Sequence, residues 1–213
     1  MKEIHVYNFP FYEFDAPAGL TERILQDVKT NVEFEQNMIN QISKRNKNYF
    51  DEELFDWFDK CLNTVKEKIQ LNQDLKIEIV GCWANKTTKL KKLHDHSHPN
   101  SFVSGSFYLT DHDNGHTVFY SKNYWYDGWE RVTMFGLNAP GQLEAGTYKP
   151  QAGKLIIFPS SLVHGTKVST DVERYSLAFN TFISGSFGNP IVSTVSLRPK
   201  TVREYYSEQN NET

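Results

Sequence analysis

Cysteine is scarce in this sequence of 213 residues, which contains only Cys61 and Cys82. Two cysteines cannot build the disulfide framework that stabilises many small secreted domains, so the chain fits a reducing compartment. We therefore expect a cytoplasmic protein. The abundance of Lys and Asn is in keeping with a phage-encoded protein that acts in a host cell.

Long apolar runs and an excess of basic residues are also missing. No apolar stretch approaches the roughly 20 residues of a membrane-spanning helix, and the opening MKEIHVYNFPFYEF lacks the apolar segment of a signal peptide. Lys and Arg number 23 against 26 Asp and Glu, which gives a formal net charge of −3. This balance provides no basic surface for nucleic acid. We expect neither a membrane nor a nucleic acid as a partner.

The first third of the chain has helical periodicity. A chain of this length without repeats or low-complexity linkers is expected to form a single domain, residues 1–213. Apolar residues recur with helical spacing from Thr21 to about Ile42, and Asp51 is the predicted N-cap of a second helix. The apolar stripe of this second helix consists of Leu54, Phe58, Leu62, Val65 and Ile69. Residues 1–74 are therefore interpreted as an N-terminal segment whose two helices support a sheet.

After residue 75 the pattern changes to short alternating segments. They include LKIEIVGCWAN, SFVSGSFYLTD, HTVFYS, GQLEAGTYK, GKLIIFPS and ERYSLAFNTFIS, with Gly, Pro, Asn and Asp at the joins. Several short strands in series predict a β-sandwich, jelly roll or barrel over residues 75–198. Residues 199–213 form a polar tail that we expect to fray. The predicted fold class is mainly β with supporting N-terminal helices.

Three histidines lie at alternate positions in the segment HDHSHPNSFVSGSFYL. Alternate side chains of an extended backbone share a face, so His94, His96 and His98 are expected to point the same way. Two of them can bind one metal ion, and His164, at the start of a later predicted strand, is the candidate third ligand. A site of this kind leaves coordination positions open for substrate and oxygen. A solvated loop without a metal explains the same cluster, so both interpretations stay open.

A possible anion receptor follows in the segment ERYSLAFN. One face of this predicted strand carries Arg174, Ser176, Ala178 and Asn180. An arginine, a hydroxyl and an amide that face a cavity can bind a carboxylate, because the guanidinium offers a two-pronged hydrogen bond and Ser176 adds another. An ion pair of Arg174 with a neighbouring acidic residue is the alternative.

In their order, the segments HSHPNSFVSGSFYL, GHTVFY, AGKLIIFPSSLVHG and ERYSLAFN resemble the iron(II)- and 2-oxoglutarate-dependent oxygenases. The resemblance covers roughly residues 77–184 and is greatest to the prolyl-hydroxylase-like branch with an HxHP...SGxYY block. It implies a double-stranded β-helix, or jelly roll. It also implies an enzyme that uses Fe(II), 2-oxoglutarate and O2 and couples decarboxylation of 2-oxoglutarate to C–H oxidation. The expected reaction is hydroxylation of a peptidyl, prolyl or small-molecule substrate.

The resemblance assigns the first and last metal ligands to His96 and His164. The family usually adds an acidic residue two positions after the first histidine, but this sequence has His98 there. Asp95 has the right chemistry on the wrong face of an extended strand. We therefore predict three histidine ligands, His96, His98 and His164, with His94 beside them. Whether the third ligand is His98, His94 or a water stays open. The identity of the metal is open as well, because the missing carboxylate leaves the centre one unit more positive.

The same resemblance implies a pocket for 2-oxoglutarate. Arg174 and Ser176 correspond to the pair that binds its distal carboxylate, and Tyr108 to a tyrosine whose hydroxyl binds the same group. Asn85 either lines the pocket or packs in the core. Asn180, on the face of Arg174, completes the predicted cofactor-binding set.

Other classes and several details stay open. A cupin-type dioxygenase with three histidines needs no 2-oxoglutarate, but it leaves Arg174 and Ser176 unexplained. A non-catalytic jelly-roll binding module is the second alternative. Segment 121–142 is either a lid over the site or a plug over the sheet, and its aromatic residues are Tyr124, Trp125, Tyr126 and Trp129. The substrate and the oligomeric state are open, with a dimer through the helices at 21–69 as one option.

Overall fold

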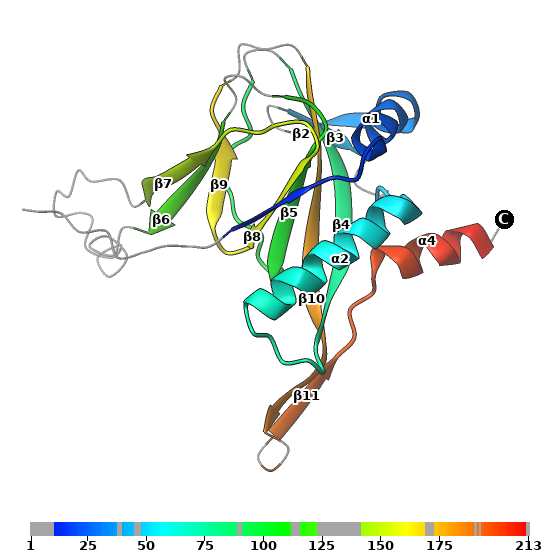
Figure 1. The fold of residues 1–213 in the computed structure, drawn as a ribbon, viewed down its shortest axis with the longest axis vertical. Coiled ribbons are helices and arrows are strands. Elements are labelled where there is room, and N and C mark those ends of the chain that lie inside the picture. The colour runs from blue at the N-terminus through cyan, green and yellow to red at the C-terminus, as the bar shows by residue number, and fades with distance from the viewer. Residues whose placement is uncertain are drawn as a thin grey trace, which may run out of the picture.

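The computed structural model describes residues 11–37, 40–44, 48–88, 91–111, 116–122, 142–168, 173–189, 191 and 193–211. Their strands form two antiparallel sheets, shown in Figure 1. The larger sheet has the order β1-β8-β5-β10-β4-β3-β2, and β11 pairs with β10 beyond this path. Its strands are β1 (Tyr12–Asp15), β2 (Phe34–Asn37), β3 (Asn40–Ser43), β4 (Lys76–Thr87), β5 (Val103–Tyr108), β8 (Lys154–Pro159), β10 (Arg174–Asn189) and β11 (Ser193–Leu197).

The smaller sheet has the order β7-β6-β9. Its strands are β6 (Thr117–Lys122), β7 (Gln142–Tyr148) and β9 (Val163–Thr166). The two antiparallel sheets form a double-stranded β-helix, which confirms the predicted fold class.

Two helices cover one face of the larger sheet. They are α1 (Leu20–Asn31) and α2 (Glu52–Lys68), and Figure 1 shows α2 crossing the sheet. Asp51 is the N-cap of α2 as predicted, because its carboxylate accepts a hydrogen bond from the Leu54 N–H at 2.9 Å. The predicted stripe is buried except for Ile69, which caps the helix and is exposed. In the described part of the chain, no helix combines the length and apolar character needed to cross a membrane.

The core lies between α2 and the sheet and is rich in aromatic rings. The ring centroid of Phe58 lies 4.7 Å from that of Phe179 and 6.0 Å from that of Phe107. Each such buried side chain contributes about 1.5–3 kcal/mol relative to an exposed one. This core holds the strands that carry the site on their other face.

The predicted helix from Thr21 to Ile42 is wrong in its second half. α1 ends at Asn31, and Val32 adopts an extended conformation. The following residues form β2 and β3, and β3 pairs with β4 at the edge of the larger sheet. Pairing with a long-range partner overrides the local helical spacing here.

The C-terminal segment is also more ordered than predicted. Helix α4 (Val202–Asn211) replaces most of the expected frayed tail. Val202 is buried in the core, and the Arg203 guanidinium contacts the carboxylates of Asp56 and Asp59 on α2 at 2.8 and 3.0 Å. One apolar anchor and these ion pairs attach a polar sequence to the domain.

Candidate metal centre and adjoining cavity

Backbone pairing brings His96 next to His164. The two residues form an isolated antiparallel bridge in which His96 N–H donates to the His164 carbonyl at 2.9 Å and His164 N–H donates back at 2.8 Å. Leu93 and Thr166 continue this pairing. The segment before β5 thus lies along the free edge of β9, which places the two imidazoles on one face.

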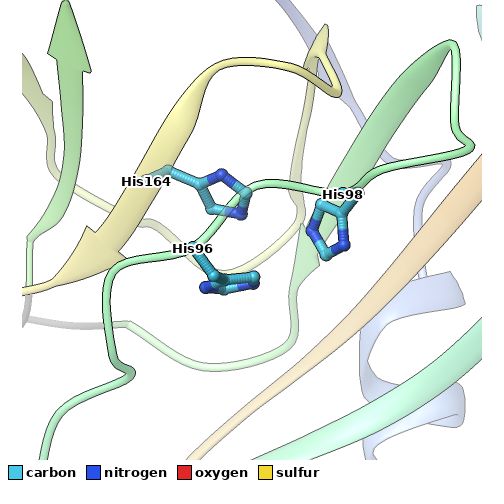
Figure 2. Close-up of side chains that lie close together, drawn as sticks. All are labelled: His96, His98 and His164. Atoms are coloured by element: carbon cyan, nitrogen blue, oxygen red, sulfur yellow. The ribbon is translucent and has the colours of Figure 1, made fainter. Parts of the chain in front are cut away.

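Three imidazoles converge at this position, as Figure 2 shows. The ring centroid of His96 lies 4.5 Å from that of His164 and 4.8 Å from that of His98. One nitrogen from each ring lies within 4.8 Å of the others. Nitrogens bound to one ion at about 2.0–2.1 Å lie about 3.0–3.4 Å apart at facial or tetrahedral angles, so binding needs an approach of up to about 1.8 Å. Small side-chain rotations supply this, and the donor set fits a metal ion.

Two of the three rings have a fixed tautomer. The Nδ1 of His96 lies 2.8 Å from the His94 carbonyl oxygen, and the Nδ1 of His164 lies 2.9 Å from that of Leu162. A carbonyl oxygen only accepts, so both Nδ1 atoms carry the proton. Each Nε2 therefore keeps its lone pair, which is the state that a metal ligand requires.

Burial keeps the cluster neutral. Desolvation is the largest cause of the lowered pKa of all three rings, and it brings the pKa of His98 to about 4 and that of His164 to about 3. The other histidines lower these pKa values further. Metal binding requires neutral imidazoles, so the site is in its binding-competent protonation state at neutral pH.

His94 and Asp95, the two residues before His96, lie outside this set of ligand atoms. The His94 ring stacks at 4.9 Å from His96, but its nitrogens are not among the converging atoms. The Asp95 carboxylate lies against Gly165, where an added Cβ would be 2.2 Å from Asp95 Oδ1. The alternation of the sequence thus predicted the orientation of Asp95.

A cavity of about 460 Å³ opens beside the three histidines. This volume is in the range of small-molecule sites. Its wall includes most of the predicted site residues, namely His96, His98, His164, Arg174, Ser176, Tyr108 and Asn85. Among the described residues that line it there is no Asp or Glu, whereas Lys44 and Arg174 are present. The cavity therefore favours an anionic ligand.

Strand register arranges the cavity wall in rows across the larger sheet. Ser176 of β10 is paired with Tyr108 of β5 on one side and with Asn85 of β4 on the other. Arg174 lies two residues further along β10, opposite Thr87. All of these side chains line the same cavity, so residues far apart in the sequence form one polar surface.

Arg174 and Tyr108 are both deeply placed. Arg174 is 3% exposed, and its Nη2 lies 3.5 Å from the Lys91 carbonyl. The Tyr108 hydroxyl lies 2.8 Å from Thr117 Oγ1, and burial raises its pKa to about 12. Tyr108 therefore stays protonated and can donate a hydrogen bond at neutral pH.

Asn180 occupies a different place from the other predicted cofactor-binding residues. It faces the same side of β10 as Arg174 but lies six residues away, about 20 Å along an extended strand. Its Nδ2 is 3.3 Å from His98 Nδ1, and its Oδ1 accepts from Ser104 at 2.8 Å. The structure thus places the Asn180 carboxamide against the Nδ1 side of the His98 ring.

Sequence reasoning missed the wall that comes from β3. Asn40 lines the cavity, is 2% exposed, and has no hydrogen-bond partner for either polar atom of its carboxamide among the described residues. Leaving such a buried group unpaired costs about 1–3 kcal/mol. Sequence reasoning placed residues 21–42 in a helix, so it did not predict that Asn40 lines the cavity.

The predicted lid or plug at 121–142 lies almost entirely outside the described residues, which include only residues 121, 122 and 142 of it.

Several solved structures share this fold. A Pseudomonas putida prolyl-4-hydroxylase is 16% identical, with a TM-score of 0.52 over 81% of this chain and 92% of that chain. HygX from Streptomyces hygroscopicus, with nickel and 2-oxoglutarate bound, is 15% identical, with a TM-score of 0.57 over 81% and 82%. The α-ketoglutarate-dependent epimerase SnoN from nogalamycin biosynthesis is 12% identical, with a TM-score of 0.54 over 91% and 90%. At these identities the likeness establishes the fold.

Sequence comparison adds the family. No curated protein matches the chain, but residues 81–180 match the family model described as "Putative 2OG-Fe(II) oxygenase". This range contains the histidine segment, His164, Arg174 and Ser176. The match agrees with the double-stranded β-helix, the converging imidazoles and the cationic cavity. Residues 81–180 are thus similar to the iron(II)- and 2-oxoglutarate-dependent oxygenases, as the motifs in the sequence predicted.

Proposed function

We propose that the protein is a hydroxylase that uses Fe(II), 2-oxoglutarate and O2 to oxidise a C–H bond of a peptidyl, prolyl or small-molecule substrate. The observation that carries this proposal is that three neutral imidazoles and a buried arginine line one cavity without a described acidic residue. The three histidines can bind a metal ion and Arg174 can bind a carboxylate. The cavity that both line accommodates a small dicarboxylate.

His96, His98 and His164 hold the iron in this proposal. One nitrogen from each ring converges on the site, and His96 and His164 are already oriented with Nε2 free by the carbonyl groups that face their Nδ1 atoms. When bound, Fe(II) together with 2-oxoglutarate supplies the redox chemistry, while the protein supplies binding and orientation.

Arg174 binds the distal carboxylate of 2-oxoglutarate. Its guanidinium offers two parallel donors, and the burial of the side chain strengthens the charge-assisted bonds. Ser176 and the protonated Tyr108 hydroxyl lie on the adjacent row and add donors, and Asn85 completes that row. The dianion loses its water on entering the cavity, which is unfavourable. These hydrogen-bond donors and the charge of Arg174 compensate for that loss.

Hydroxylation is supported by the prolyl hydroxylases among the similar folds, which include one from Trichoplax adhaerens in complex with a peptide fragment. HygX, with hygromycin B bound in one structure, illustrates a small-molecule substrate on the same fold. The test of the reaction class is product analysis: a substrate that gains one oxygen atom per succinate formed supports hydroxylation. An epimerised product of unchanged mass contradicts it.

The first experiment needs no substrate. Fe(II) is added to the metal-free protein under nitrogen, 2-oxoglutarate follows, and the visible charge-transfer band of the chelate is recorded. We expect the band in the wild type and its loss in Arg174→Ala at the same 2-oxoglutarate concentration. Arg198→Ala removes an exposed guanidinium and serves as the matched control, which keeps the band.

The alternatives give different results in this experiment. Iron binding without the band favours the cupin-type dioxygenase, which the set of three histidines also fits. Absence of iron binding favours a non-catalytic jelly-roll module and contradicts the proposal.

A further inference from the structure

The three histidines differ in what fixes their rings. The Nδ1 atoms of His96 and His164 face backbone carbonyls, which can only accept a hydrogen bond. The Nδ1 of His98 instead faces the Asn180 carboxamide at 3.3 Å. A carboxamide carries a donor and an acceptor, and a half-turn exchanges them, so this contact does not fix which nitrogen of His98 holds the proton.

A chain of hydroxyl groups continues behind Asn180. The Asn180 carboxamide contacts Ser104 Oγ at 2.8 Å, and Ser104 Oγ lies 2.8 Å from Ser160 Oγ. Ser160 Oγ lies 2.7 Å from Ser101 Oγ, which can in turn donate to the Thr181 carbonyl at 3.1 Å. Ser160 also accepts the His98 backbone N–H through its carbonyl at 2.9 Å. The chain is therefore attached to His98 at both the ring and the backbone.

This chain is satisfied in either direction. In one direction the hydroxyls donate toward Asn180 Oδ1, and the carboxamide N–H donates to His98 Nδ1. In the other direction His98 Nδ1–H donates to Asn180 Oδ1, the carboxamide N–H donates to Ser104, and the last hydroxyl, Ser101, donates to the Thr181 carbonyl. Hydroxyl groups rotate to suit either arrangement, so neither direction leaves a buried group unpaired.

The direction decides whether His98 can bind through Nε2. When Nδ1 of a neutral imidazole accepts, the proton sits on Nε2 and blocks that nitrogen. When Nδ1 donates, Nε2 presents a lone pair. We propose that Asn180 is a positioning residue whose carboxamide oxygen accepts from His98 Nδ1–H, and that the Ser104–Ser160–Ser101 chain reverses to allow this when the metal binds. This inference rests on the proposed metal site of three histidines.

The inference gives Asn180 a role other than binding 2-oxoglutarate. Its distance along β10 from Arg174 separates it from the carboxylate pocket, and among the described residues its side chain has hydrogen-bond contacts with His98 and Ser104. Partners behind a metal ligand orient the ring and raise its basicity, and their loss weakens metal binding by about 10- to 100-fold. Metal binding by His98 thus depends on the orientation of the Asn180 carboxamide, whose oxygen has to face His98 Nδ1.

The first test is a measurement of tautomers with Zn(II) as the metal probe. Long-range ¹H–¹⁵N spectra of the wild type distinguish Nδ1–H from Nε2–H for each histidine. On addition of Zn(II) we expect His98 to show Nδ1–H and a metal-bound Nε2, as His96 and His164 do. A His98 that binds through Nδ1, or that keeps Nε2–H, overturns the inference.

The second test is a pair of variants at one position. Asn180→Leu keeps the shape and removes both hydrogen bonds, whereas Asn180→Asp can only accept from a neutral imidazole. Zn(II) affinity, measured by competition with a chelator, should fall about 10- to 100-fold in Asn180→Leu and be retained or increased in Asn180→Asp. Asn31→Leu, at an exposed amide on α1, is the matched control without effect.

The outcomes separate this inference from the proposed function. If the wild type binds no Zn(II), the metal site and the inference both fail. If the wild type binds and Asn180→Leu binds equally well, only the inference fails. Thermal melts accompany each variant, because a merely structural role would lower stability in Asn180→Asp without preserving metal affinity.

Discussion

Alternate residues of β10 form its two faces, one of which packs in the core while the other lines the cavity. Tyr175, Leu177 and Phe179 point into the core toward the helices, whereas Arg174 and Ser176 line the cavity. Arg174 is 3% exposed and Phe179 is 0% exposed, so burial alone does not distinguish them. The difference is what each side chain faces: a close-packed core stabilises the fold, and a cavity lined with donors binds a ligand. Substitutions on the two faces should therefore separate binding from stability.

The largest effect is expected on metal binding. His164→Ala removes a buried ligand of the proposed site and should abolish Fe(II) binding, while the circular dichroism spectrum stays that of a folded protein. Iron stoichiometry after gel filtration is the measurement. His116→Ala, a histidine outside the cluster, is the control, and unchanged stoichiometry in His164→Ala would contradict the assignment.

The core face should show the opposite behaviour. Phe179→Ala removes a ring that packs 4.7 Å from Phe58, and the cavity it leaves should lower the free energy of unfolding by about 3–5 kcal/mol. Denaturant titration measures this loss. Metal affinity of the folded fraction should stay near that of the wild type. A loss below about 1 kcal/mol would show that the core relaxes into the space.

The anion end of the cavity comes next in size. Arg174→Ala should raise the Kd for 2-oxoglutarate about 30- to 150-fold, because a charge-assisted two-pronged contact is worth about 2–3 kcal/mol. Calorimetric titration of the Fe(II) protein under nitrogen gives this value, with Arg198→Ala as the control. Unchanged affinity would place the 2-oxoglutarate pocket elsewhere.

A smaller effect tests how tightly the core face is packed. A Cβ added at Gly105 would lie 2.1 Å from the Phe179 ring, whereas one added at Gly146 meets no atom within 4 Å. Gly105→Ala should therefore cost about 1–3 kcal/mol of stability. Gly146→Ala, on the smaller sheet, should change the free energy of unfolding by no more than about 0.5 kcal/mol. Equal melting temperatures for the two variants would contradict this packing.

The last prediction concerns pH. The pKa is lowered to about 4 for His98 and about 3 for His164, below the value near 6.5 of an unfolded chain. Between these values the unfolded state binds more protons, so the stability of the metal-free protein is expected to fall as the pH drops below about 6.5. Melting temperatures at pH 7.5 and pH 5 measure this. The fall should be shallower in His164→Ala, and an equal fall would contradict the shift.

Local pattern was enough for some of the fold and much of the site. Alternation along ERYSLAFN placed Arg174 and Ser176 on one face and Phe179 on the other, because the side-chain period of a strand is fixed. The N-cap at Asp51 was predictable for the same reason, since a cap depends only on residues within one turn.

Pattern failed where a distant partner decides the conformation. Residues 34–43 continue a helical spacing in sequence, yet they form strands because β4 offers an edge to pair with. Residues 202–211 look like a solvated tail, yet Val202 and Arg203 dock them against α2 as a helix. Alternation along β10 predicts that Asn180 binds the cofactor, but the histidine segment passes beside it and places His98 against its carboxamide.

By itself, the sequence determined the alternation of the strands, the spacing of His96 and His98, the side on which Asp95 lies, and the pairing of Arg174 with Ser176 on one face. These features depend on backbone periods that act over a few residues. Only the tertiary structure decided that His164 bridges His96, that β3 walls the cavity, and that Asn180 stands behind His98. The physical reason is that contacts between distant segments depend on which strand edges remain free to pair, and local periodicity does not specify this.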